Sequence, residues 1–186
     1  MRKIRAQAEI DRKKRKNQIL VGGVMIAVLV TSIVAFSFGS GGNDGDSSKV
    51  SENGVDFFRQ NGVWVAEIDG GVFGFQNLPS EVSDVDVDVS IGLGQYTGQV
   101  LYFVNPNEGA NEVLTNIGRY VLRYQEACLN GDDCEGDLPM KDCDDNLIIF
   151  EGGDATEVYQ DGSCVFIVGD SLKGTDAFLY KVLQII

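Results

Sequence analysis

The chain has 186 residues, with 28 acidic and 15 basic side chains, a net charge of −13, four cysteines and no histidine. Without histidine the chain cannot form a Ser-His-Asp triad, a Cys-His catalytic pair or a zinc site that uses imidazole. General acid–base chemistry would have to use carboxylates, tyrosine or lysine, and the length suits one packed domain.

The first 18 residues are strongly basic. They carry eight lysines and arginines against two acidic side chains. Residues 19–38 follow without a charged side chain, and 20 helical residues span ~30 Å, the thickness of a bilayer core. Because short cytoplasmic segments are rich in lysine and arginine, we predict a cytoplasmic tail at 1–18, a transmembrane helix at 19–38 and an extracytoplasmic remainder.

Other interpretations of this segment stay open. A cleaved signal peptide has a shorter apolar core of about 7–15 residues, although the small side chains within 35–37 suit a cleavage site. A pilin-like leader would also place basic residues before an apolar helix, and would be cut ahead of Ile19. A buried soluble helix would need a polar face, which 19–38 lacks. The expected partner is the lipid bilayer, and no nucleic acid is expected.

Residues 39–50 are predicted to be a flexible linker of glycine, serine and aspartate, followed by an extracytoplasmic domain at 51–186. Short strands are expected at 64–68 and 72–75, because Asp69-Gly70-Gly71 between them is a hairpin turn signal. Residues 19–186 carry a net charge of −19. Such a surface favours basic partners or cations and keeps a domain soluble.

Valine and aspartate alternate strictly over residues 84–89. In a strand, this pattern places three valines on one face and three aspartates on the other. A half-buried strand with a solvated acidic face is the favoured interpretation. A calcium-binding strip is the alternative, although calcium takes six to eight oxygen ligands from several directions. Residues 92–94 are predicted to form a loop.

A strand at 99–104 precedes a predicted helix at 107–128. Asn105 suits the helix cap and Pro106 suits the first turn. Apolar residues then recur at helical spacing and predict one buried stripe on the helix. The members of this stripe are Val113, Leu114, Ile117, Val121 and Tyr124.

Further strands are expected at 147–150, 156–160 and 164–168, the last two joined by an Asp161-Gly162 turn. An amphipathic helix is expected at 175–186, with Thr175 or Ser171 as its cap. Its predicted core-facing residues are Ala177, Phe178, Val182, Leu183 and Ile186. With a parallel crossover over 99–150, the order of elements predicts an α/β fold in which two main helices pack on a mixed sheet. A two-layer α+β fold is the alternative.

All four cysteines lie in the predicted outer domain, at Cys128, Cys134, Cys143 and Cys164. An even number of cysteines outside the cytoplasm indicates two disulfides, for which three pairings are possible. We favour Cys128 with Cys134, closing a short loop, and Cys143 with Cys164, tying a loop to a strand. The spacing contains no C-X-X-C pair, so a zinc site or a thioredoxin-type redox site is disfavoured.

Acidic residues are dense between Cys128 and Asp145, and calcium binding there is an alternative to a solvated loop. The run lacks the ligand spacing of an EF-hand. The seven acidic residues are Asp132, Asp133, Glu135, Asp137, Asp142, Asp144 and Asp145.

Residues 164–170 (CVFIVGD) and 175–185 (TDAFLYKVLQI) resemble the ends of small membrane-anchored archaeal proteins of unknown function. The strand at 101–104 before a helix and the placement of Cys143 before 147–150 are also similar. The resemblance covers about residues 64–186. It implies an anchored outer domain in an archaeal envelope and carries over no catalytic residue.

These observations lead to three functional hypotheses. The first is a single-pass membrane protein whose outer domain binds or positions an envelope partner. The second is an extracytoplasmic enzyme that uses a pair of carboxylates about 5–10 Å apart, as in sugar hydrolysis. The sequence gives no basis for choosing two acids, and no catalytic, cofactor-binding or metal-binding residue is assigned. The third is a pilin-like surface-assembly subunit with a mature terminus near Ile19.

Overall fold

The computed structural model describes residues 48–134 and 136–186, all of which belong to one compact unit. The predicted tail at 1–18, the predicted membrane helix at 19–38 and most of the predicted linker lie outside these residues. Within the described part, no helix has both the length and the apolar character that crossing a membrane requires. The domain itself combines helices with several β-sheets, as the mixed α/β prediction requires.

The first sheet is an antiparallel meander of four consecutive strands. They are β1 (Lys49–Glu52), β2 (Val55–Gln60), β3 (Val63–Ile68) and β4 (Gly71–Phe75). Each turn is a pair with positive φ at both residues: Asn53-Gly54, Asn61-Gly62 and Asp69-Gly70. Two-residue turns of this kind match the twist of hairpin strands, and Asn-Gly and Asp-Gly are their preferred sequences. The local sequence therefore sets the register of the whole sheet.

The second sheet has six strands in the order β5-β11-β12-β10-β6-β7. All neighbouring pairs are parallel except β11 and β12, which form an antiparallel hairpin. The strands are β5 (Asp86–Asp88), β6 (Val100–Val104), β7 (Arg123–Glu126), β10 (Leu147–Glu151), β11 (Glu157–Asp161) and β12 (Cys164–Val168). A short parallel pair, β8 (Cys128–Leu129) and β9 (Met140–Lys141), forms a third sheet.

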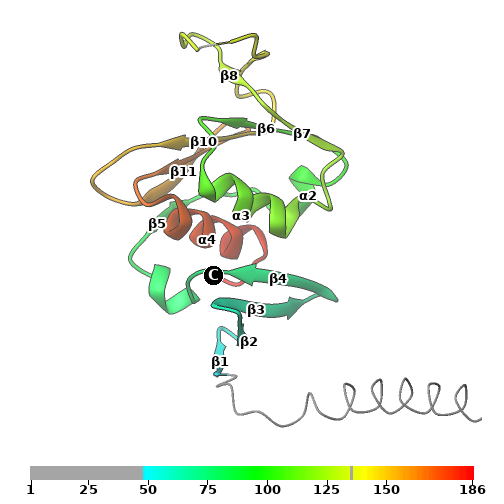
Figure 1. Ribbon diagram of the computed structural model, residues 1–186, viewed down its shortest axis with the longest axis vertical. Helices are drawn as coiled ribbons and strands as arrows, with labels where there is room; N and C mark the ends of the chain where they lie inside the picture. The colour runs from blue at the N-terminus through cyan, green and yellow to red at the C-terminus, as the bar shows by residue number, and fades with distance from the viewer. Residues whose placement is uncertain (1–47, 135) are drawn as a thin grey trace, which may run out of the picture. The chain divides into compact units, whose positions relative to one another are not determined.

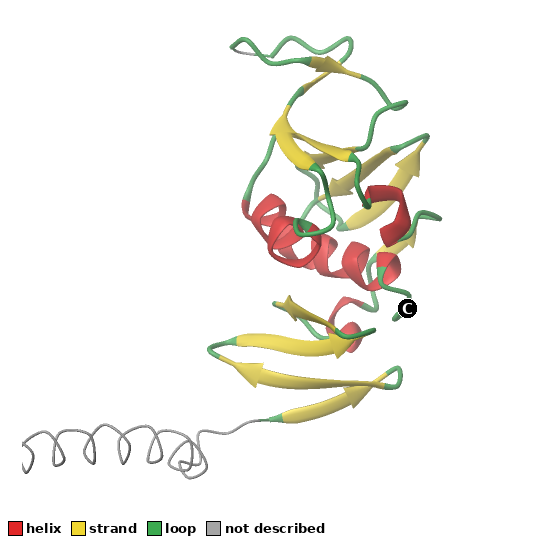
Figure 2. Cartoon of the chain, turned by 90° about the vertical axis from the view of Figure 1, so that its right-hand side faces the viewer, coloured by secondary structure: helices red, strands yellow, loops and turns green. Residues whose placement is uncertain are grey.

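Two helices, α3 (Glu108–Ile117) and α4 (Ser171–Val182), lie between the four-stranded and six-stranded sheets (Figures 1 and 2). The shorter elements are the 3₁₀ helix η1 (Pro79–Val82) and helix α2 (Leu93–Tyr96). Since both sheets cover it, α4 buries most of its circumference, including the polar residues Thr175 and Asp176. The domain thus has three layers, with the helices as the middle layer, rather than the two layers of the α+β alternative.

Aromatic side chains join the four-stranded sheet to α4. The ring of Tyr180 lies 4.4 Å from that of Phe75 and 6.0 Å from that of Phe57, centroid to centroid. All three side chains are fully buried in the main core, which also contains the inward residues of the six-stranded sheet. Burial of such rings stabilises each by several kcal/mol, so the small outer sheet is firmly docked on the helix layer.

The predicted helix at 107–128 is wrong in length. Helix α3 ends at Ile117, and residues 123–126 form strand β7 beside β6. The cap is Asn107, whose side chain accepts a hydrogen bond from the Gly109 N–H, whereas Asn105 adopts a positive φ before the helix. The apolar spacing of 113–124 favours a helix locally, but pairing with β6 overrides it. The direct crossover is therefore β6–α3–β7, while β6 and β10 are parallel neighbours as expected.

Four smaller predictions are also corrected. The C-terminal helix runs from Ser171 to Val182 and not over 175–186, because Asp170 caps it by accepting from the Lys173 N–H. Ile186, predicted to face the core, is 45% exposed because it follows the end of the helix. The predicted loop at 92–94 includes the start of α2, and β1 begins at Lys49, inside the predicted linker at 39–50.

Candidate functional site

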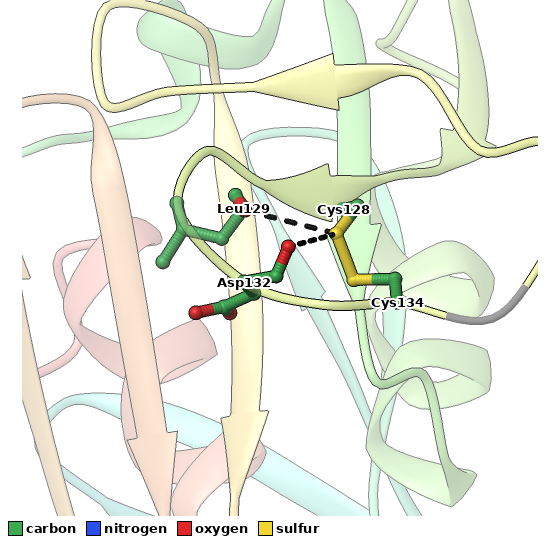
Figure 3. Close-up of a disulfide and its surroundings, with 4 residues drawn as sticks. All are labelled: Cys128, Leu129, Asp132 and Cys134. Atoms are coloured by element: carbon green, nitrogen blue, oxygen red, sulfur yellow. Dashed lines mark hydrogen bonds between the residues drawn. A yellow bond between two sulfur atoms is a disulfide. The ribbon is translucent and has the colours of Figure 1, made fainter.

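Both favoured disulfides are present. Cys128 is joined to Cys134 with a Cα–Cα distance of 6.0 Å, and Cys143 is joined to Cys164 at 4.9 Å. Figure 3 shows the first bond, where the carbonyl oxygens of Leu129 and Asp132 each lie 3.7 Å from the Cys128 sulfur. A disulfide sulfur carries no proton, so these are close contacts and not donated hydrogen bonds. All four cysteines are thus oxidised in pairs, and no free thiol remains among them.

The cysteine-bearing segment between β7 and β10 packs on the face of the six-stranded sheet opposite the helices. Ala127, Leu129 and Cys143 form a second core cluster with outward residues of β6, β10 and β12. Lys141 reaches the same cluster, with its Nζ 4.4 Å from the Tyr102 ring centroid and 3.1 Å from the Asp145 carboxylate. The disulfides therefore hold a cover in place over an otherwise open sheet face, which is a structural role.

The two acidic runs that the sequence offers for calcium do not form metal sites within the described residues. No group of three or more histidine, cysteine, aspartate or glutamate side chains in that part of the chain is arranged to hold a metal ion. In the run at 84–89, Val85 and Val89 are buried whereas Asp84, Asp86 and Asp88 are exposed. This arrangement confirms the half-buried strand with a solvated acidic face.

Two carboxyl groups are buried between the helices and β4. Asp176 is fully enclosed, and its Oδ2 accepts hydrogen bonds from the backbone N–H groups of Gln76 and Asn77 at 3.0 and 2.7 Å. The Asn77 side-chain amide donates a third at 2.9 Å, while Oδ1 has no partner. Burial, with a smaller contribution from the nearby Glu112 carboxylate, raises the pKa of Asp176 to about 7, although the hydrogen bonds from Asn77 and Gln76 act to lower it. Burial also raises the pKa of Glu112, against a hydrogen bond from Gln76.

These carboxyl groups belong to a polar seam that fixes the four-stranded sheet on the helices. Asn116 of α3 accepts a hydrogen bond from the Gly74 N–H at 2.8 Å and donates one to the Gly74 carbonyl at 2.7 Å. The Tyr180 hydroxyl donates to the Asn77 carbonyl. Since the seam lies between layers and Asp176 has no exposed surface, a substrate has no access to the pair. The arrangement positions backbone and does not resemble a glycosidase site, whose acids flank a bound sugar.

An open groove of about 680 Å³ lies where β5, η1, the end of α4 and the β1–β2 turn meet. Its apolar wall consists of Val82, Val85, Val87 and Ile186. Its polar wall includes Ser80, Glu52 and Lys181. The Glu52 carboxylate is held in place by the Ser80 N–H and hydroxyl, both 2.7 Å away. The volume lies in the range of small-molecule and side-chain binding sites.

Some residues of the groove stand out in the sequence, but the groove itself does not. The sequence predicts that Val85, Val87 and Ile186 face the core. Val85 and Val87 do lie at the edge of the core, where they also line the groove. Glu52 and Ser80 were not singled out, because they come together only when the β1–β2 hairpin docks beside η1. No local pattern in the chain records that contact, which joins residues 28 positions apart.

No family model, curated protein or solved structure matches the chain.

Proposed function

We propose that the protein is a single-pass membrane protein whose acidic outer domain binds a partner at the cell envelope. The observation that carries the proposal is the pair of closed disulfides in a domain that follows a basic tail and 20 uncharged residues. Disulfides persist in oxidising compartments, and the basic flank favours a cytoplasmic N-terminus, so the two signals agree on one orientation. The archaeal origin implied by the resemblance is part of this proposal.

Binding is favoured over catalysis by where the polar groups lie. The buried carboxyl groups with raised pKa values are enclosed between layers, whereas the groove beside β5 is open and has one apolar and one polar wall. Catalytic acids must reach their substrate, and these cannot do so without separating the sheet from the helices. An open groove that combines apolar side chains with polar groups can orient and hold a binding partner.

The test is the intact mass of the full chain extracted from membranes, with and without reduction before thiol alkylation. We expect the full-length mass, with four alkylated cysteines only after reduction. Protease added to sealed, right-side-out cells or vesicles should degrade the outer domain and spare the N-terminal tail. A mass lacking the first 18 or 38 residues would instead indicate a pilin-like or secreted protein. Four cysteines alkylated without reduction would overturn the outward orientation.

A further inference from the structure

We propose that the groove and the free edge of β5 together bind an extended peptide segment in which basic and apolar residues alternate. This inference rests on the proposed binding role and names the chemistry of the partner. Three features support it, namely the open strand edge, the groove beside it and the acidic side chains on the opposite face of the same strand.

Strand β5 ends the six-stranded sheet on one side. It pairs only with β11, in parallel, with Val87 opposite Val158. Peptide groups on its other side have no backbone partner within the described residues. An exposed strand edge is a template for an added strand, because main-chain hydrogen bonds give affinity without regard to sequence.

The two faces of β5 differ sharply, and this difference sets the sequence that an added strand would need. Val85 and Val87 point toward the helix side, where they line the groove. The carboxylates of Asp86 and Asp88 point to the opposite face, are exposed and make no hydrogen bond or ion pair with the residues that the structure describes. A neighbouring strand places alternate side chains on these two faces, so an apolar residue would enter the groove while its neighbours lie beside the aspartates.

The acidic residues around the outward face of β5 favour basic side chains at the outward positions of an added strand. Glu157 of β11 lies directly across from Asp86. Tyr159, across from Asp88, has a raised pKa, mainly because of burial and also because acidic residues lie nearby. Residues 48–186 carry seven basic and 24 acidic side chains. Lysine or arginine at alternate positions of the added strand would therefore be attracted to this edge.

A second copy of this chain is a poorer occupant. Two β5 edges placed side by side would bring Asp86 and Asp88 of both copies together, and like charges on paired strands are destabilising. Charged residues on an edge strand also protect a sheet against unselective pairing. The basic tail at 1–18 is predicted on the other side of the membrane, so the partner is expected to be another polypeptide.

The probe is the fluorescein-labelled peptide Lys-Val-Lys-Ile-Lys-Val-Lys, titrated with the full chain in neutral detergent and followed by anisotropy. We expect a Kd on the order of 10–100 µM, as for a short strand-forming peptide. A peptide of the same composition with its four lysines in one block should bind at least about tenfold more weakly, since it cannot alternate. Equal binding of both peptides would overturn the proposal, because it would indicate unselective attraction to an acidic protein.

The matched variants separate this edge from the general charge of the domain. Asp86→Lys with Asp88→Lys should weaken binding about tenfold or more, and Ser83→Trp should do so by filling the groove, which Ser83 lines. Glu67→Lys with Glu126→Lys makes the same change in net charge at exposed residues of β3 and β7 and should alter the Kd less than about threefold. Circular dichroism establishes that each variant is folded.

Equal losses in the two charge-reversal pairs would overturn the proposal, as would undiminished binding by Ser83→Trp. Dimerisation of the full chain that Asp86→Lys with Asp88→Lys changes would assign the edge to a second copy and would also overturn it. The binding assay in detergent does not depend on orientation. A failure of the topology test therefore leaves this result standing, and a failure here leaves the anchored orientation intact.

Discussion

The four-stranded sheet joins only strands that follow one another in the chain, whereas the six-stranded sheet, apart from the β11–β12 hairpin, joins strands that are separated by other elements. In the first, β1 to β4 are linked by three tight turns of Asn-Gly or Asp-Gly. In the second, Asp86 pairs with Glu157, and Leu147 pairs with Tyr102. The first sheet has no disulfide and docks through aromatic rings and a polar seam, whereas the second is closed on its outer face by a disulfide-bonded segment. Local and distant pairing thus need different means of stabilisation in one domain.

The strongest test of the first sheet's docking is Phe75→Ala. This fully buried ring contacts Phe57 and Tyr180, so its removal should lower the free energy of unfolding by about 3–5 kcal/mol. Urea unfolding of the full chain in detergent measures the effect. Val72→Ala, at a side chain that is 56% exposed on the same strand, is the control and should change stability by less than about 0.5 kcal/mol. A loss below about 1 kcal/mol at Phe75 would mean that the sheet does not depend on this contact.

The polar seam predicts an unusual dependence on pH. The pKa of Asp176 in the folded protein is about 7, above its ordinary value of 3.8, so the folded state binds the proton more tightly than the unfolded chain does. The stabilisation is therefore complete below about pH 4 and is lost as the pH rises through 7, by up to ~4 kcal/mol.

Asp176→Asn keeps the shape and an acceptor for the three N–H donors but removes the titration, so the decrease between pH 4.5 and 7.5 should become smaller. Urea unfolding at both pH values measures it. Glu112→Gln is the companion variant and should flatten the curve less, because the pKa of Glu112 is raised but its side chain is not fully enclosed. An unchanged slope in Asp176→Asn would show that the seam does not titrate in this range.

The disulfides of the second region should differ in strength according to the loops that they close. Replacing Cys143 and Cys164 by alanine opens a loop of 21 residues and should cost about 3 kcal/mol, whereas replacing Cys128 and Cys134, six residues apart, should cost about 2 kcal/mol. Thermal unfolding of both double variants compares them directly. A larger loss from the shorter loop would show that strain or packing, and not loop closure, determines the contribution.

The smallest effect concerns one turn of the meander. Gly62 has a φ of +87°, and a Cβ there would meet no neighbouring atom, so Gly62→Ala should cost only the backbone strain of about 1 kcal/mol. Gly94→Ala in α2 is the control, because Gly94 is also in open space but has an ordinary helical conformation. If both variants were equally stable, the turn would not constrain the register of β2 and β3.

Sequence patterns predicted what is encoded locally. The hairpin turn at Asp69-Gly70, the alternation at 84–89 and the β11–β12 hairpin are all present. Turns at Asn53-Gly54 and Asn61-Gly62 carry the same local signal, so strands β1 and β2, which the predicted strands above do not include, are also encoded locally. The pairing of the cysteines could be favoured because one candidate pair closes a short loop.

The remaining features depend on contacts between distant segments. The helical apolar spacing of residues 113–124 runs into strand β7, which pairs with the edge of β6 instead of continuing the helix. The burial of Asp176 follows from a second sheet covering α4, and an exposed polar face would have been expected there. The groove is likewise formed where four separate elements meet, so none of its residues carries a signal for it.

Helix α4 has a consequence for how the protein is made. It follows every strand of both sheets in chain order and lies between them, where it covers the inner face of each. The ribosome therefore completes both sheets' strands before it makes the element that buries them. During synthesis, the rings of Phe57 and Phe75 stay uncovered until residues 171–182 have been made, so the domain cannot complete its folding before that segment emerges.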